Sequence, residues 1–166
     1  NKEIKLLVKE DVLYASIGSN TNSGVVDSPE GKVDIPSFHW TLSGRKYGNS
    51  GTSGFCNYSE SVQEDSTINE GKFSNASIIS FNLMDDEIAT YATGIRNVKG
   101  YSVTSDGKII AIVGGIENSG DRPLEGDKDY IYSIKEKSWY GWPDFSGGDP
   151  VTSPRFIRSE EHTSEL

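Results

Sequence analysis

The stretch Gly100-Tyr-Ser-Val-Thr-Ser-Asp-Gly-Lys-Ile-Ile-Ala-Ile-Val113 determines the fold class of this chain. Two runs rich in β-branched and aromatic residues, 100–104 and 108–113, flank the polar triplet 105–107. Such runs favour strands, and an Asp-Gly pair is a strong signal for a tight hairpin turn because glycine readily adopts a positive φ. The stretch therefore predicts an antiparallel β-hairpin.

The same pattern recurs on both sides of this hairpin. Apolar runs separated by short polar turns occupy 4–8 with 12–17, 77–83 with 88–92, and 130–134. Residues 77–134 therefore supply about four successive strands, which is the make-up of one antiparallel propeller blade. No convincing amphipathic helix pattern is present. We predict an all-β fold, a partial β-propeller of about two to three blades built from four-stranded antiparallel sheets.

The composition limits the functions open to the chain. Only 34% of its 166 residues are hydrophobic and 18 are glycine, which is typical of short strands joined by long turns. The formal net charge of -9 excludes the basic footprint that binding to nucleic acid or an anionic membrane requires. No apolar run approaches the roughly 18 residues that span a bilayer, and no signal-peptide pattern is visible.

The segment between Ser19 and Asn75 differs from the rest of the chain. It is rich in Gly, Ser, Asn and Asp and shows little periodicity. So long an irregular segment inside a compact domain predicts a functional insertion or local disorder.

Two motifs resemble a known family. Gly94-Ile95-Arg96-Asn97 follows a predicted strand, and Tyr140-Gly141-Trp142-Pro143 follows a turn some forty residues later. Both are similar to motifs of the glucose/sorbosone dehydrogenases, β-propellers that include quinoprotein sugar dehydrogenases using pyrroloquinoline quinone (PQQ). The similarity is closer to a bacterial branch of that family, through the stretches 22–26, 36–39 and 144–156, and it covers nearly all of residues 12–156. It implies oxidation of a sugar, and it implies a secreted or extracytoplasmic location.

The two ends of the chain predict that it is an internal fragment. It begins at Asn1 without methionine, and its closing run, 158–166, resembles a translated sequencing adapter. We therefore expect residues 1–157 to be a propeller fragment and 158–166 to be a tail that is not native. A fragment with incomplete blades should expose apolar sheet faces, be inactive, and fold poorly or aggregate.

The resemblance implies a cofactor site at Arg96, Asn97, Lys99 and Tyr140. A guanidinium beside an amide suits a carboxylate or quinone oxygen. The alternative is that Arg96 pairs with a nearby acid while Asn97 caps the turn. Members of the family often continue Asn-Pro-Gln-Gly, whereas this chain has Val98-Lys99-Gly100, a departure expected where cofactor binding has lapsed.

The resemblance also implies calcium, for which an acidic loop offers oxygen ligands. The candidate ligands are Glu117, Asp127 and Asp129, of which Asp129 directly precedes a predicted strand. The alternative is a solvated acidic loop, since the Asp-rich calcium-loop pattern is absent.

The aromatic cluster offers pocket walls for a sugar or a quinone. Tyr140, Trp142 and Trp139 could stack on such a ring, or they could fill the space between neighbouring sheets. We expect the second role for Trp142 and leave both roles open for Tyr140.

No catalytic residue is assigned within the chain. Sugar oxidation requires a base for the hydroxyl proton, and the resemblance implies a histidine ahead of strand 12–17, upstream of this chain. His39 is expected to have a structural or loop role, and His162 lies in the adapter-like tail. Two hypotheses follow: a fragment of a quinoprotein sugar dehydrogenase, or a non-catalytic propeller that binds a carbohydrate or protein partner.

Overall fold

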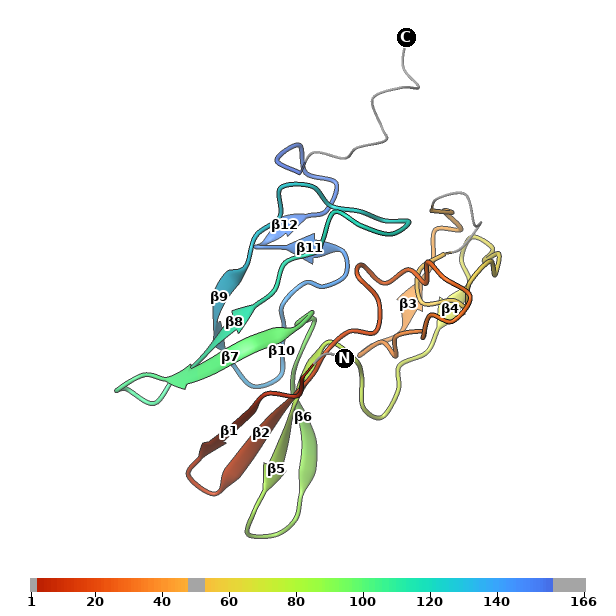
Figure 1. Ribbon diagram of the computed structural model, residues 1–166. Helices are drawn as coiled ribbons and strands as arrows, with labels where there is room; N and C mark the ends of the chain where they lie inside the picture. Colours follow the sequence, from red (N-terminus) through yellow and green to blue (C-terminus); the bar gives the residue numbers. More distant parts are fainter. Residues whose placement is uncertain (1–2, 48–52, 157–166) are drawn as a thin grey trace.

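The computed structural model describes residues 3–47 and 53–156 and shows an all-β chain (Figure 1). Within these ranges the residues form twelve strands and no helix, and so none that could span a membrane. The strands are β1 (Leu6–Lys9), β2 (Val12–Ile17), β3 (Trp40–Thr41), β4 (Thr67–Ile68), β5 (Ser77–Asn82), β6 (Ile88–Thr93), β7 (Val98–Val103), β8 (Ile109–Val113), β9 (Tyr130–Ile134), β10 (Ser138–Trp139), β11 (Phe145–Ser146) and β12 (Asp149–Pro150). The adapter-like tail and His162 lie outside the described residues.

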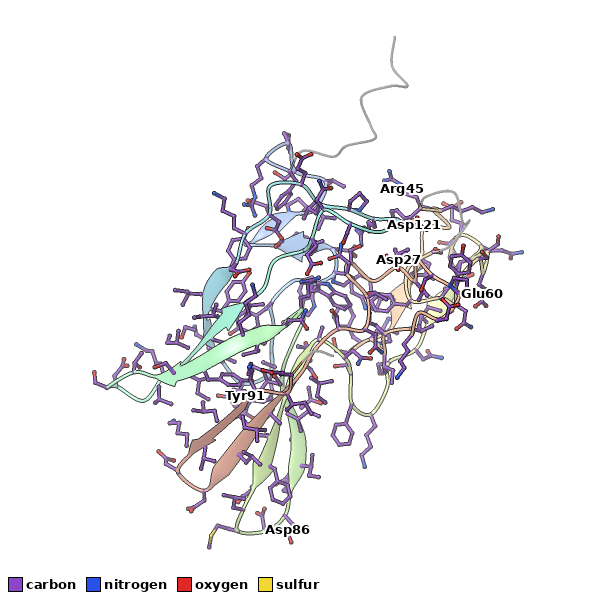
Figure 2. The ribbon with its side chains drawn as sticks, viewed as in Figure 1. Asp27, Arg45, Glu60, Asp86, Tyr91 and Asp121 are labelled. Atoms are coloured by element: carbon purple, nitrogen blue, oxygen red, sulfur yellow. The ribbon has the colours of Figure 1, made fainter. Side chains whose placement is uncertain are left out.

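The first sheet has the order β1-β2-β5-β6-β10. Its first four strands are antiparallel and β10 pairs in parallel with β6 at one edge. The predicted turns join the strands: Glu10 and Asp86 both have positive φ, and Asp86 lies at the tip of the β5–β6 hairpin (Figure 2). The predicted strand ranges are correct to within about two residues.

The second sheet has the order β7-β8-β9 and is antiparallel throughout. Gly107 has a φ of +80° in the β7–β8 turn, as the Asp-Gly pair predicts. The run 130–134 is confirmed as β9 with the same bounds.

One prediction about the sheets is wrong. Residues 77–134 do not form one four-stranded sheet, because β5 and β6 pair with the first sheet and β7 starts the second. The chain changes direction after β6 at Gly94, whose φ is +69°, and continues through the buried residues Ile95 and Arg96. Four neighbouring antiparallel strands do occur in the first sheet, but they are β1, β2, β5 and β6. A long insertion separates β2 from β5 in the sequence.

That insertion, residues 18–76, forms a separate lobe beside the sheets (Figure 1). Among its described residues it contains the short antiparallel pair β3 and β4 and the isolated bridge between Val25 and Gly54. Side chains, instead of paired strands, accept hydrogen bonds from the backbone here. The Asp34 carboxylate accepts from the backbone amides of Asn20 and Thr21. A segment held together in this way does not need the alternation of apolar and polar residues that strands show, and its sequence has none.

The main core lies between the two sheets. It contains Tyr14, Ile78 and Ala92 from the first sheet and Val98, Ile109, Ala111, Val113 and Ile134 from the second. A second cluster joins the insertion to the C-terminal loops through Phe55, Ala76, Ile116, Leu124, Trp142, Val151 and Phe156. The two sheets therefore share one buried core, and the lobe shares a second one with the C-terminal loops.

The outer faces of both sheets are also apolar. On the first sheet a row across four strands pairs Val8 with Leu13, Leu13 with Phe81, and Phe81 with Ile88. Side chains alternate between faces along a strand, so this row lies opposite the core residue Tyr14. Val8 is 60% exposed, and Ile131 on the outer face of the second sheet is 72% exposed.

Candidate functional site

A polar cleft of about 590 Å³ lies where the predicted cofactor motif meets the acidic loop. Val98 at the start of β7 pairs with Val113 at the end of β8, which in turn pairs with Tyr130 at the start of β9. Antiparallel pairing thus brings the segment before β7 and the β8–β9 loop to the same end of the second sheet. Six of the seven predicted site residues line the cleft: Arg96, Asn97, Lys99, Glu117, Asp127 and Asp129.

Arg96 is buried and its guanidinium is held by the protein itself. Its Nε donates to the Asn22 carbonyl (3.0 Å), and Nη1 donates to the Gly115 carbonyl (2.6 Å). Nη2 donates to Asn22 Oδ1 (2.8 Å) and forms an ion pair with Glu117 (3.2 Å). This arrangement matches the alternative in which Arg96 pairs with a nearby acid.

Asn22 is the residue that sequence reasoning missed. Its side-chain amide donates to the carbonyls of Glu117 and Ser119, and its Oδ1 accepts from the Glu117 amide. Its own carbonyl also accepts from Trp142 Nε1. Asn22 lies 74 residues from Arg96, in the irregular insertion, and its role in the site was not predicted from the sequence.

Lys99 and Asp129 form an exposed ion pair on the cleft wall. Lys99 Nζ lies 2.6 Å from Asp129 Oδ2, with side-chain exposures of 56% and 49%. The hydrogen bond from Lys99 is the main cause that lowers the pKa of Asp129, and the Gly115 amide contributes. Both side chains keep polar atoms in reach of solvent and therefore of a ligand.

Asp127 organises the neighbouring loop. Its Oδ2 accepts from the Ile116 amide (2.8 Å) and the Ser146 hydroxyl (2.6 Å), and its Oδ1 accepts from the Tyr130 hydroxyl (2.7 Å). Three donors thus converge on one carboxylate. The hydrogen bond from Ser146 connects the cleft to strand β11.

Tyr140, the seventh predicted residue, lies outside the cleft. Its hydroxyl donates to the Ser133 carbonyl and accepts from the Lys135 amide, closing the turn after β9. Its ring packs against the main core, 5.2 Å from the ring of Tyr132. This position gives Tyr140 a packing role.

The two tryptophans of the aromatic motif also differ. Trp142 is buried in the second cluster, as the packing role predicted. Trp139 is 39% exposed and stands edge-to-face with Phe145. His39 is exposed in the insertion and does not line the cleft.

The charges of the cleft are balanced. Among the described residues, its lining contains four cationic and four acidic side chains: Lys5, Arg96, Lys99 and Lys128 against Glu3, Glu117, Asp127 and Asp129. No set of three or more His, Cys, Asp or Glu side chains in the described ranges is arranged to hold a metal ion. The local charge is therefore close to neutral in a chain of net charge -9.

No protein-family model, curated protein or solved structure matches this chain.

Proposed function

We propose that this chain is a non-catalytic β-sheet module that binds a neutral, polyhydroxylated small molecule, a sugar, in the polar cleft. The observation that carries the proposal is the convergence of six predicted site residues on one cavity of about 590 Å³ with matched charges. Cavities of roughly 300–1,000 Å³ are typical of small-molecule sites.

The polar groups of the wall suit hydroxyl groups. A hydroxyl both donates and accepts hydrogen bonds, so one sugar hydroxyl can donate to Asp129 while another accepts from Lys99. Both of these side chains are half exposed, and the exposed residues Asn118 and Lys128 extend the same rim. A neutral polyol can use these groups without leaving any charge uncompensated.

The quinone implied by the family resemblance does not fit this arrangement. PQQ carries three carboxylates and needs cations that are free to meet them. The Arg96 guanidinium is already bonded to two backbone carbonyls, the Asn22 amide oxygen and Glu117, and the Lys99 ammonium is neutralised by Asp129. Binding PQQ through these residues requires those contacts to break.

Calcium does not fit either. Both oxygens of Asp127 accept hydrogen bonds from protein donors, and Asp129 is paired with an ammonium group at 2.6 Å. A calcium ligand has to direct its oxygen lone pairs at the ion and keep cations away from it. The sugar dehydrogenase assignment therefore stays a prediction, and PQQ binding is its test.

A titration experiment with matched variants tests the sugar proposal. Glucose, galactose, mannose and cellobiose are titrated into the 166-residue chain and into Asp129→Asn and Asp106→Asn. Asp106 forms an ion pair with Lys108 of the same 2.6 Å length at the distant β7–β8 turn, which makes it a matched control. We expect saturable binding of at least one sugar, about tenfold weaker in Asp129→Asn and unchanged in Asp106→Asn.

Two results would overturn the proposal. One is the absence of saturable binding by any of the four sugars in a sample whose NMR spectrum is dispersed. The other is saturable binding of PQQ with calcium that Asp129→Asn abolishes, which would favour the quinoprotein instead.

A further inference from the structure

The outer face of the first sheet carries two apolar rows across β1, β2, β5 and β6. One is the row from Val8 to Ile88 described above, and the strand register places a second row beside it. This second row consists of Leu6, Ala15, Ile79 and Thr90. Neither row contains a charged side chain. We call these eight residues the first outer face.

The outer face of the second sheet is smaller and also uncharged. It consists of Gly100, Ser102, Ile110, Ile112, Ile131 and Ser133, which pair across β7, β8 and β9. These positions lie on the side opposite the core residues Ile109 and Ala111, because side chains alternate along a strand. Ile112 is 45% exposed and Ile131 is 72% exposed. We call these six residues the second outer face.

Both outer faces have the character of surfaces that another sheet covers. Strands covered on both sides read as near-continuous apolar runs, and β2 (VLYASI) and β8 (IIAIV) are runs of this kind. Sheets cover one another by stacking such faces about 10 Å apart. The inner faces of the two sheets already form one core in this way. Each outer face therefore fits one further β-sheet.

The turns that border the two faces differ in charge. The turns of the first sheet, 9–11 and 83–87, carry five acidic side chains and one lysine, a net charge of −4. The turns of the second sheet, 104–108 and 135–137, carry three lysines and two acids, a net charge of +1. Two of those lysines pair with the two acids, so Lys135 supplies the excess positive charge.

These turns lie at the same end of the molecule. The Lys9 ammonium group would be 3.9 Å from a Cβ added at Gly107, so the β1–β2 turn is close to the β7–β8 turn. The inserted lobe joins the other end of the first sheet, between β2 and β5, and lies away from the turns (Figure 1). Two sheets stacked with their turns together therefore also bring the charges of those turns together.

We propose that the first outer face of one copy of this chain binds the second outer face of another copy, head to tail. Two first outer faces stacked with their turns together would place two acidic sets of turns side by side, whereas the head-to-tail contact places an acidic set beside a weakly basic one. A symmetric contact would also cover only one outer face of each chain. The head-to-tail contact covers both kinds of face, and it can repeat from copy to copy.

The proposal is independent of sugar binding, because no residue of either outer face lines the polar cleft. Asp129→Asn should therefore leave the association unchanged.

The experiment uses the full chain and two double variants. Leu6→Thr with Val8→Thr alters the first outer face, and Ile112→Thr with Ile131→Thr alters the second. Threonine keeps a high strand propensity, and all four side chains are exposed. Ile35→Thr is the control, since Ile35 is 48% exposed but belongs to the inserted lobe. Association is measured by analytical ultracentrifugation, and thermal melts establish that the variants are folded.

We expect the unaltered chain and Ile35→Thr to form species larger than a dimer as concentration rises. Each double variant alone should be monomeric at the same concentrations. An equimolar mixture of the two should form dimers and nothing larger, because each variant keeps the face that the other lacks. Native mass spectrometry with one variant labelled with ¹⁵N should show that these dimers contain one chain of each kind.

Three results would overturn the proposal. The first is a monomeric unaltered chain. The second is association of either double variant alone, which would indicate a symmetric contact through its remaining face. The third is a mixture that stays monomeric although both variants melt cooperatively. If a double variant does not melt cooperatively, Val8→Thr and Ile131→Thr repeat the mixing test with one substitution each, and the same outcomes apply.

Discussion

The guanidinium of Arg96 connects the insertion, the β6–β7 connection and the β8–β9 loop. It bonds to Asn22, Gly115 and Glu117 while its side chain is only 7% exposed. A buried cation held by several acceptors contributes to stability mainly because those acceptors become unpaired when it is removed. At the residue scale this gives Arg96 a structural role.

Replacing Arg96 by methionine should therefore lower the free energy of unfolding by about 2–4 kcal/mol. Urea denaturation followed by tryptophan fluorescence measures the change. Asn22→Ala should destabilise the same region because it removes the shared partner. Unaltered stability in Arg96→Met, accompanied by lost sugar binding, would instead make Arg96 a ligand-binding residue.

The Lys99–Asp129 pair should respond to pH in a defined direction. The pKa of the Asp129 carboxyl is lowered in the folded chain. The ion pair therefore contributes its full stability above the ordinary carboxyl pKa of about 3.9, and this contribution is lost as the pH falls through the lower folded pKa. Because both side chains are half exposed, the contribution at neutral pH should be below about 1 kcal/mol. Urea melts of the chain and Asp129→Asn should differ slightly at pH 7 and converge near pH 2. A larger difference at pH 2 than at pH 7 would contradict this.

At the element scale, the β7–β8 hairpin depends on the backbone of Gly107. Its φ of +80° is unfavourable for a side-chain-bearing residue, although an added Cβ would approach nothing closer than the Lys9 side chain at 3.9 Å. Gly107→Ala should therefore cost about 1 kcal/mol of stability through backbone strain alone.

Gly100→Ala is the matched control for that change. It lies on β7, no heavy atom lies within 4 Å of the added Cβ, and its φ is not in the positive range. Its effect on thermal unfolding should be small or stabilising. Equal losses of stability in the two variants would show that backbone conformation is not the cause.

The hairpins could be predicted from sequence because their signals are local. Alternation of apolar residues and an Asp-Gly or acidic turn are contained within about 14 residues, as in 100–113. The parallel pairing of β10 with β6 could not be predicted, because it joins residues more than forty positions apart. For the same reason the sequence did not reveal the division of 77–134 between two sheets.

In the candidate site, too, the local features could be predicted from the sequence and the long-range contacts could not. The motif at Arg96 and Asn97 and the acids at 117–129 were recognised as polar groups, and strand pairing does place them together. Their shared partner was not foreseen, because Asn22 comes from the insertion and its Oδ1 accepts from Arg96. Contacts over such separations leave no periodic trace in sequence.

At the scale of the whole molecule, both sheets expose an apolar outer face. Leu6 and Val8 are 62% and 60% exposed on the first sheet, and Ile112 and Ile131 form an exposed pair on the second. Exposed apolar patches of this kind promote association, and β1 is also an edge strand. We therefore expect the chain to self-associate at micromolar concentration.

The double variant Leu6→Thr with Val8→Thr should shift the chain towards monomer in analytical ultracentrifugation without a large loss of stability. Leu7→Thr is its control, because the Leu7 side chain packs against the main core from the same strand. That variant should lose about 1–2 kcal/mol of stability and gain no monomer. A monomeric, cooperative melt of the unaltered chain would contradict the expected association.

A two-dimensional NMR titration of a neutral sugar into the chain is the most direct test of the proposed binding cleft. Saturable shifts are predicted for the amides of 96–99, 114–118 and 126–129, which line the cleft, with the β7–β8 turn at Asp106 unaffected. The absence of shifts in those segments, or shifts caused there by PQQ with calcium and by no sugar, would contradict the proposed function.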